Sequence, residues 1–171
     1  MTRWVGRSDD LIQCLEIRRA VFIEEQGVSV EDEVDGKDSK ALHFLLRDNT
    51  VPVGTARILI LDEIGKIGRV CVLAPYRGRG HAKALMGACL SHLKADERVT
   101  TVKLGAQISA LGLYESLGFQ AYGADYMDAG TLHRDMVLCE PKRLRRCEAN
   151  ALWGCRYLAL PTRFPLHLFE T

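Results

Sequence analysis

The chain has 171 residues, a length that suits a single domain with one sizeable core. Apolar residues make up 47% of the chain and charged residues 26%, the proportions of an ordinary globular protein. The formal net charge is +1, so nothing in the composition indicates the broad positive field of a nucleic-acid-binding protein.

The first residues lack the apolar stretch of a signal peptide, and no apolar run approaches the roughly 18 residues that span a bilayer. We therefore expect a cytoplasmic protein that binds neither nucleic acid nor membrane. None of the six cysteines forms a C-x-x-C pair, so we expect free thiols and no metal site.

A first helix is predicted by the capping cluster Ser8-Asp9-Asp10 and by apolar residues at helical spacing from Leu11 to Val21. Gly27 marks its end. The acidic stretch that follows, residues 31–38, has the composition of a turn and predicts a loop. Two interpretations of its charge stay open: a solvated surface, or a site that attracts a cationic amine such as a polyamine or a lysine side chain.

Six strands are predicted from apolar runs bounded by turn residues. They are 41–47, 52–61, 66–73, 100–104, 119–122 and 132–139. Apolar residues at helical spacing from Ala82 to Leu93 predict an amphipathic helix, and 109–117 predicts a short helix closed by Gly118. This order favours an α/β (α+β) fold of three layers, with a mixed central sheet flanked by helices on both faces.

Two parts of the chain differ in character. Residues 1–140 contain all the predicted strands and form the expected domain. Residues 141–171 form a C-terminal extension that is first basic and then apolar. Its apolar side chains predict that it packs on the domain or on a second subunit, which favours a homodimer.

The segment Arg-Gly-Arg-Gly-His-Ala, residues 77–82, lies between a predicted strand and the start of a predicted helix. The first turn of a helix offers unpaired N–H groups and a partial positive charge, and both suit a phosphate. Gly78 and Gly80 let the backbone approach a bulky anion, while Arg77 and Arg79 add positive charge. We expect this segment to bind a pyrophosphate; the alternative is a glycine-rich turn with solvated arginines.

Two other phosphate-binding patterns are absent from the sequence. The string G-x-x-x-x-G-K-[ST] of P-loops does not occur, and Lys83 stands where a dinucleotide fingerprint has its third glycine. The expected ligand is therefore neither a nucleoside triphosphate nor NAD.

Residues 77–82 resemble the [Q/R]-x-x-G-x-[G/A] signature of the GNAT acetyltransferases, which implies that they bind the pyrophosphate of acetyl-CoA. Residues 113–119 are similar to the L-Y-x-x-x-G-F segment of this family. Residues 17–26 resemble the R-x-x-V-F-x-x-E-Q opening of the ElaA-like branch, and residues 128–136 resemble its closing G-x-x-H-x-x-M. The resemblance covers residues 3–140 and implies the GNAT-type three-layer fold.

The resemblance implies a set of residues that bind acetyl-CoA as a co-substrate, without a metal. They are Val70, Cys71, Val72, Arg77, Gly78, Arg79, Gly80, His81, Ala82, Gln107 and Tyr114. The backbone of residues 70–72 would pair with the pantetheine arm and offer an N–H to the developing oxyanion. The side chain of His81 is expected to face the phosphate loop or solvent, and Gln107 stands where many members have Asn.

The implied reaction is direct transfer of an acetyl group from acetyl-CoA to an amine in a ternary complex. Tyr114 would give a proton to the departing thiolate, because a phenol of pKa ~10 is reasonably matched to a thiol of pKa ~8.5. Glu25 is the first candidate for the base or the amine anchor, and a structural carboxylate paired with an arginine is the alternative. Glu24 and His133 are candidate substrate-binding residues, and a structural histidine is the alternative for His133.

Two other interpretations compete with direct transfer. An acyl-cysteine on Cys71 would allow a two-step reaction, but the alternation along its strand and the lack of a neighbouring base favour burial. A non-catalytic acyl-CoA-binding or sensing module would keep the same cofactor site and have no need of Tyr114. The acceptor, a small-molecule or peptide amine, is not identified by the sequence.

Overall fold

The computed structural model describes residues 2–139. Within this range, seven strands form one sheet in the order β1-β2-β3-β4-β5-β7-β6. They are β1 (Arg3–Ser8), β2 (Leu42–Asp48), β3 (Val51–Leu61), β4 (Ile64–Val72), β5 (Thr101–Gln107), β6 (Gln120–Asp128) and β7 (Thr131–Cys139). The helices are α1 (Leu11–Arg18) with its π-helical continuation η1 (Arg19–Glu25), α2 (Val30–Glu33), α3 (His81–Ala95) and α4 (Leu111–Glu115), and short 3-10 turns lie at Asp38–Lys40, Ala74–Tyr76 and Ile108–Ala110.

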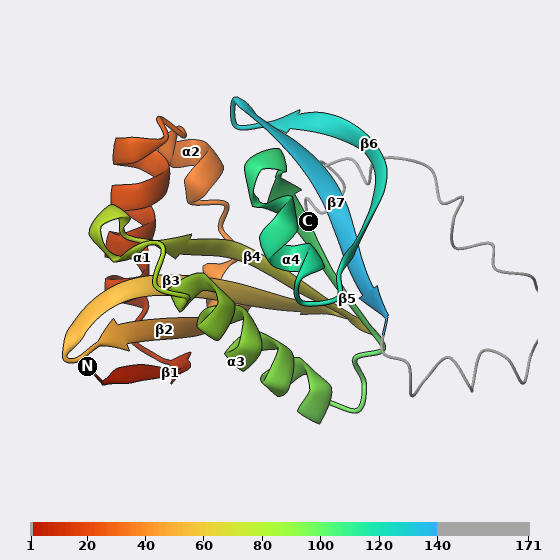
Figure 1. Ribbon diagram of the computed structural model, residues 1–171, viewed down its shortest axis with the longest axis horizontal. Helices are drawn as coiled ribbons and strands as arrows, with labels where there is room; N and C mark the ends of the chain where they lie inside the picture. Colours follow the sequence, from red (N-terminus) through yellow and green to blue (C-terminus); the bar gives the residue numbers. More distant parts are fainter. Residues whose placement is uncertain (1, 140–171) are drawn as a thin grey trace, which may run out of the picture.

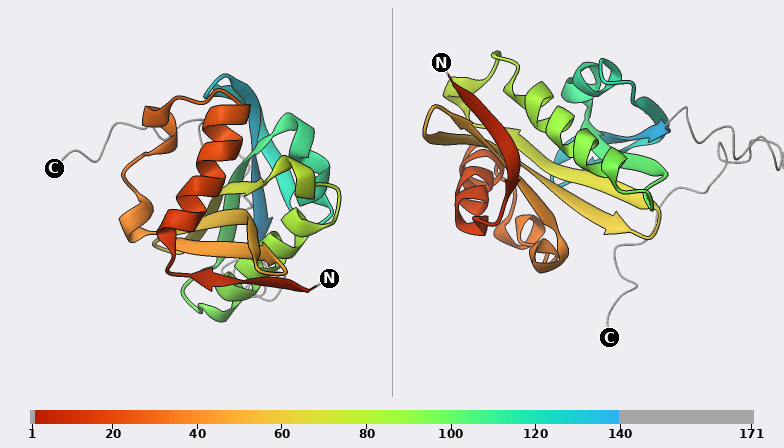
Figure 2. Two further views of the ribbon diagram at one scale, coloured as in Figure 1. Left: turned by 90° about the vertical axis from the view of Figure 1, so that its left-hand side faces the viewer. Right: turned by 90° about the horizontal axis from the view of Figure 1, so that it is seen from below.

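The elements form three layers. Helices α1 and α2 lie against one face of the sheet, and α3 and α4 lie against the other (Figures 1 and 2). On the first face, α1 packs on Leu45 and Cys71 in a small apolar cluster. On the second face, a larger cluster contains Leu85 and Met86 of α3 and Tyr114 of α4. The predicted mixed sheet with helices on both faces is confirmed.

Among the described strands, β4 and β5 are the parallel neighbours, and they pair only briefly. Their register runs from Ile64↔Thr101 to Lys66↔Lys103. Past this point β4, to Val72, and β5, to Gln107, no longer pair with each other, although β4 stays paired with β3 and β5 with β7. The sheet therefore opens between them (Figure 1). Backbone donors and acceptors along the opening are left without a strand partner, which suits them to a ligand.

Two strands depart from the prediction because they are edge strands with little apolar signal. β1 was not predicted; it pairs with β2 from Arg3↔Asp48 to Ser8↔His43, and its outer residue Trp4 is 46% exposed. β6 continues to Asp128 rather than to Tyr122, and most of its side chains are exposed. A half-exposed edge strand needs no regular apolar alternation, so composition cannot reveal it.

The first helix lies where it was predicted, but its second half is wider than an α-helix. In η1 the Gln26 N–H donates to the Val21 carbonyl at 3.1 Å, a bond between residues five apart. Such π-helical turns occur frequently at functional sites. The change of pitch alters the direction in which Glu25 and Gln26 leave the helix.

The acidic stretch 31–38 is not the open loop that was predicted. It contains most of α2 and begins the 3-10 turn at Asp38. Arg18 of α1 is fully buried and binds the carboxylates of Glu33 and Asp38, and Arg57 of β3 also binds Asp38. The interpretation as a solvated or amine-attracting loop is wrong for these carboxylates, because arginines of the domain already neutralise them.

The predicted extension, 141–171, lies outside the described residues. Within residues 2–139, no helix is long and apolar enough to cross a membrane. In the same range, no group of three or more His, Cys, Asp or Glu side chains is placed to hold a metal ion.

Candidate active site

The loop 77–82 connects the end of β4 to the first turn of α3. Gly78 and Gly80 have φ values of 73° and 75°, in the left-handed region that glycine adopts without strain. Within the described residues, the N–H groups of residues 78–83 donate to no protein acceptor. The loop therefore presents a row of free backbone donors at the positive end of a helix, as a phosphate site requires.

A cavity of about 300 Å³ lies against this loop. Its wall consists of Val72, Arg77, Gly78, Gly80, His81, Ala82, Lys83 and Leu113. These residues come from the end of β4, from the loop with the start of α3, and from α4. The volume falls at the lower end of the range of small-molecule sites. The cavity thus connects the free amides with the helix that carries Tyr114.

The side chain of Arg77 has two structural partners. Its Nε donates to the Val72 carbonyl at 2.8 Å, and its two terminal nitrogens donate to the two carboxylate oxygens of Glu25 at 2.7 Å each. The hydrogen bonds from Arg77 lower the pKa of Glu25. Glu25 is therefore an arginine-paired carboxylate, and the guanidinium of Arg77 is not a free positive charge as the sequence suggested.

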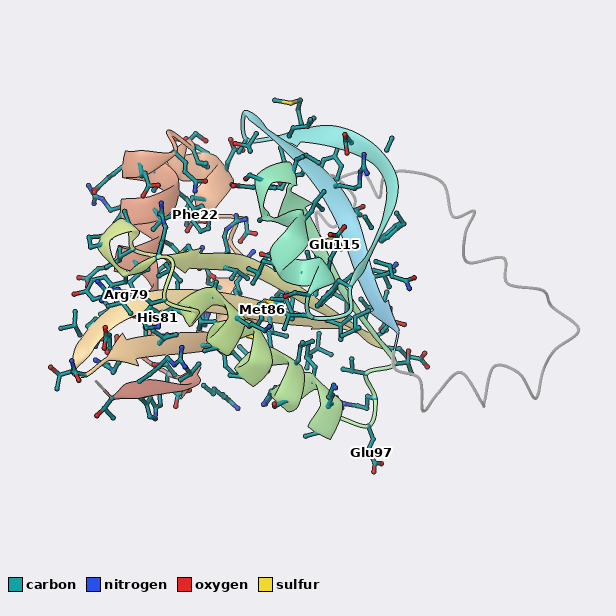
Figure 3. All side chains as sticks on the ribbon, viewed as in Figure 1. Phe22, Arg79, His81, Met86, Glu97 and Glu115 are labelled. Carbon is teal, nitrogen blue, oxygen red and sulfur yellow. The ribbon has the colours of Figure 1, made fainter. Side chains whose placement is uncertain are left out.

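The side chain of His81 is buried at 4% exposure, whereas the sequence predicted that it faces the loop or solvent (Figure 3). Its Nε2 lies 3.9 Å from the carboxylate of Asp48, which ends β2 and is itself buried. Half-exposed Arg79 lies 3.7 Å from the same carboxylate, with its guanidinium 5.5 Å from the centre of the Tyr76 ring. Asp48 therefore lies beneath the loop and faces two of its side chains.

A β-bulge shapes β4 beside the opening. Arg69 and Val70 together lie opposite the single residue Ala56 of β3, and Arg69 has a φ of 52°. The side chain of Arg69 donates to the carbonyls of Asp32 and Glu33 at 2.7 and 3.1 Å. The bulge is thus held from the α2 side, at the start of the predicted cofactor-binding residues 70–72.

Cys71 is buried, and burial raises the pKa of its thiol far above its usual range. This agrees with the expectation that Cys71 is a core residue, because a reactive cysteine needs an accessible thiolate.

Tyr114 of α4 is 7% exposed, and its ring meets that of Phe119 edge-on with centroids 6.2 Å apart. Burial raises the pKa of Tyr114 to about 12, with smaller contributions from the neighbouring Cys71 and Cys89 thiols. The phenol therefore stays protonated at neutral pH. It can donate a proton, although it holds that proton more tightly than a free phenol does.

Gln107 faces the α1 side of the opening. Its Nε2 donates to Oε1 of Gln26 at 3.0 Å, so this bond joins the end of η1 to β5. His133 of β7 is the cross-strand partner of Gln107. The ring of His133 stacks on Tyr126 with centroids 6.0 Å apart, and its Nδ1 lies 2.9 Å from the Thr131 carbonyl. Gln107 and His133 therefore share one region of the sheet.

Glu24 lies apart from these contacts. Its carboxylate accepts a hydrogen bond from Nε of Arg19 at 3.0 Å, and its side chain is 59% exposed. The structure thus places the cofactor loop, Tyr114 and residues 70–72 around one end of the opening, and Glu24 on the outer surface of η1.

Sequence reasoning missed three polar residues of this region. Asp48 lies just beyond the predicted strand 41–47, and Tyr126 lies beyond the predicted strand 119–122. Asp135 accepts a hydrogen bond from the Tyr126 hydroxyl at 2.9 Å. The polar residues at alternate positions Thr131, His133 and Asp135 are the signal that could have indicated a half-solvated strand face.

The geometry is that of a site for a long, phosphate-bearing ligand whose far end reaches a buried proton donor. Residues 16–139 match the family model of the acetyltransferase (GNAT) domain. The chain belongs to the GNAT acetyltransferase family. The GNAT domain model covers every element just described except β1 and the first part of α1.

Relatives of the GNAT chain agree with this assignment. A Bacillus subtilis (strain 168) protein that bears the name of an inferred acetyltransferase is 39% identical to this chain over 132 residues. The match covers 75% of this chain and 89% of that protein. The uncharacterised N-acetyltransferase YjcF of the same organism is 32% identical over 130 residues, and the match covers 75% of this chain and 92% of YjcF. The crystal structure of Escherichia coli ElaA is 32% identical, with a TM-score of 0.69 and coverage of 80% of this chain and 97% of that chain.

The similarity to ElaA fits the ElaA-like strings in the sequence, and the structure gives each polar residue of the first string a partner. Arg18 binds the carboxylates of the acidic stretch, Glu25 binds Arg77, and Gln26 binds Gln107. In this GNAT domain the string R-x-x-V-F-x-x-E-Q therefore joins α1 to the α2 region, to the phosphate loop and to β5.

Proposed function

We propose that this GNAT protein transfers an acetyl group from acetyl-CoA directly to an amine in a ternary complex. One observation carries the proposal: the free amides of residues 78–83 and the opening between β4 and β5 meet at one cavity, which α4 also lines. A pyrophosphate suits the amides, and an amide-containing arm suits the unpaired backbone of β4. Within the described residues, the site thus fits acetyl-CoA.

The residues with a direct part in binding follow from this fit. Backbone groups of the loop would hold the pyrophosphate, with Arg79 as the nearby exposed cation. Residues 70–72 of β4 would pair with the pantetheine arm. A backbone N–H in the same stretch would stabilise the negative charge that develops on the carbonyl oxygen.

Acetyl-CoA supplies a thioester, whose carbonyl carbon is open to attack by a neutral amine. Transfer forms a C–N bond and breaks the C–S bond. The Tyr114 hydroxyl would protonate the departing sulfur. The nitrogen of the acceptor loses a proton once it is bonded to the carbonyl carbon, and this proton would restore the phenol. The sum is an amide and a free thiol, so no further reactant is needed. Because the pKa of Tyr114 is about 12, the two proton transfers must be closely coupled.

The amine must reach the site in its neutral form. Glu25 remains our candidate for the residue that anchors the amine. The pairing with Arg77 lowers the pKa of Glu25 and makes it a weak base. Glu24 and His133 stay candidate acceptor-binding residues. The acceptor would be a small-molecule or peptide amine, met in the cytoplasm.

The decisive experiment measures two quantities on the full chain. Calorimetry gives the affinity for acetyl-CoA, and thiol release is followed with a panel of amines. Binding together with amine-dependent thiol release is the expected result. Binding without turnover on any amine would favour the non-catalytic acyl-CoA-binding module, and absence of binding would overturn the assignment of the loop.

A further inference from the structure

The face of the sheet opposite α3 and α4 carries aromatic and acidic side chains on β5–β7. Leu104 and Ala106 of β5 pack in the core under α3 and α4, so Gly105 between them faces the other side. The partner of Gly105 on β7 is Asp135, and the partner of Asp135 on β6 is Tyr122. Cross-strand partners share a face. These residues therefore lie on the face that α1 covers further along the sheet.

Tyr126 holds Asp135 in a defined position. Its hydroxyl donates to Oδ1 of Asp135 at 2.9 Å, and its ring stacks on His133 at an interplanar angle of 25°. A Cβ on Gly105 would lie 2.6 Å from the Tyr126 hydroxyl oxygen and 3.7 Å from Oδ1 of Asp135. The absent side chain of Gly105 is therefore what admits this hydroxyl–carboxylate pair.

The carboxylate of Asp135 is not neutralised by the part of the chain that the structure describes. None of the described basic side chains forms an ion pair with it, whereas Glu33, Asp35 and Asp38 are all paired with arginines. Burial, and then the hydrogen bond to Asp135 and the charge of Asp135, raise the pKa of Tyr126. Asp135 is thus an available anion with its second oxygen not hydrogen-bonded to any described residue.

The aromatic rings beside Asp135 suit a cation. The ring of Tyr122 already has a cation beside it, because the ammonium nitrogen of Lys103 lies 5.6 Å from the ring centre. This ammonium forms no ion pair with Asp135 among the described residues. Aromatic faces next to a carboxylate are the surroundings in which proteins bind ammonium groups. A ligand cation at Asp135 would have Tyr126 beside it, while the ring of Tyr122 stays with Lys103.

The position of Asp135 relative to the opening sets a length for the ligand. The last paired residues of β4 and β5 are Lys66 and Lys103, and Gln107 lies four residues further along β5, at the level of the opening. Asp135 lies opposite Gly105, two residues back from that level. At a strand rise of about 3.3 Å per residue, this is a separation of about 7 Å.

We propose that the acceptor carries a second cationic group besides the amine that is acetylated, and that Asp135, held by Tyr126, binds this group. A diaminoalkane or a side chain with a distant second charge has the required length. The inference rests on the proposed acetyl transfer at the opening. It does not depend on the acidic stretch 31–38, whose buried carboxylates are already paired with arginines.

The test compares diaminobutane with butylamine, which has the same carbon chain and lacks the second charge. Calorimetry in the presence of coenzyme A gives binding without turnover, and thiol release from acetyl-CoA gives kcat and KM. The wild-type chain is expected to bind diaminobutane about 10-fold or more tightly than butylamine. Asp135→Asn should remove most of this preference by raising KM, with little change in kcat, because asparagine can still accept from Tyr126.

Asp125→Asn is the matched control. Asp125 is an exposed carboxylate on β6 that pairs with Arg134, and its loss should leave the preference unchanged. Equal affinity of the wild-type chain for the two amines, or an undiminished preference in Asp135→Asn, would overturn the inference and leave acetyl transfer intact. Failure of acetyl-CoA to bind and to react with any amine would instead count against the proposed function.

Discussion

Both carboxylate oxygens of Glu25 accept a hydrogen bond from Arg77, each at 2.7 Å, while Nε of Arg77 donates to the Val72 carbonyl at 2.8 Å. The pair joins the end of η1 to the end of β4 and to the loop that follows it. It therefore connects the α1 layer with the phosphate loop. It also keeps Glu25 ionised by lowering its pKa.

Glu25→Gln distinguishes a base from a structural partner. Because the pKa of Glu25 is lowered, its titration should not appear in the pH profile of kcat/KM near neutrality, and the shape of the profile should be unchanged in the variant. The affinity for acetyl-CoA should fall by no more than about 5-fold, since exposed pairs contribute about 1 kcal/mol or less. The control is Glu16→Gln, an exposed carboxylate of α1, which should change neither quantity. Loss of an acidic limb in Glu25→Gln alone would identify Glu25 as the base.

Tyr114→Phe removes the proposed proton donor and keeps the ring that packs on Phe119. Turnover should fall about 100-fold or more, because general acid catalysis contributes that much, and the acetyl-CoA affinity should stay within about 2-fold. Tyr76→Phe, beside the phosphate loop, should keep normal turnover. Unaltered turnover in Tyr114→Phe would remove this residue from the mechanism.

Gly80→Val places a β-branched side chain where φ is 75°, a conformation that such residues avoid. The loop should lose its cradle, and calorimetry should show no binding of acetyl-CoA. Gly87→Ala is the control: its Cβ would contact nothing within 4 Å, and it lies inside α3. That variant should bind acetyl-CoA normally. Its free energy of unfolding should be about 0.5–1 kcal/mol higher than that of the wild-type chain. Normal binding by Gly80→Val would contradict the pyrophosphate assignment.

The partly buried carboxylates Asp35 and Asp38 predict how stability depends on pH. Burial alone would raise the pKa of Asp38, but hydrogen bonds and charges from Arg18 and Arg57 outweigh it and lower the pKa below 3.8; Asp35 is lowered in the same way, chiefly by Arg57. A group with a lowered pKa stabilises the fold above its unfolded pKa, and this contribution is lost as pH falls through the folded value. The free energy of unfolding, from urea titrations, should therefore decrease below about pH 4.

Asp38→Asn should reduce the free energy of unfolding by about 3 kcal/mol at neutral pH, because it leaves Arg18 and Arg57 partly uncompensated in the interior. The decrease in the free energy of unfolding as the pH falls should also become smaller. Glu31→Gln removes an exposed carboxylate from the same stretch and should do neither. Equal stability of Asp38→Asn and the wild-type chain would show that the ion pairs contribute nothing net.

Cys71→Ala tests the two-step alternative. Since burial raises the pKa of the thiol, native protein should resist alkylation at Cys71, and the variant should keep turnover within a few-fold. Mass spectrometry of the wild-type chain with acetyl-CoA should find no acetyl group on this residue. An acetylated Cys71, together with an inactive Cys71→Ala, would replace direct transfer by an acyl-cysteine route.

The parts of the fold that bury apolar side chains at regular spacing could be predicted from the sequence. The helix that became α3 buries Leu85, Met86, Cys89 and Leu90 at the spacing that predicted it, and the loop before it has the expected backbone. β1 and most of β6 could not be predicted, because exposed edge strands leave no such pattern. The backbone of the phosphate loop and of α3 was therefore more predictable than the edge strands β1 and β6.

The side-chain partners in the site were not predictable, because they are far apart in sequence. Gln26 and Gln107 are separated by 81 residues, and Glu25 and Arg77 by 52. Charge counted along the chain made residues 31–38 look like a free acidic surface, since the arginines that neutralise them come from other elements. Arg57, a charged residue within the apolar run of β3, was the one local signal of a buried ion pair.

The π-helical turn η1 has a consequence for the contacts of this region. Each residue of an α-helix turns the chain by about 100°. If residues 19–25 took α-helical pitch with their number unchanged, the chain would turn further over this segment, and both Glu25 and Gln26 would rotate away from Arg77 and Gln107 together. The wider pitch of η1 therefore sets the contacts of the first helix with both sides of the site at once, so that a change in this one turn would break both contacts together.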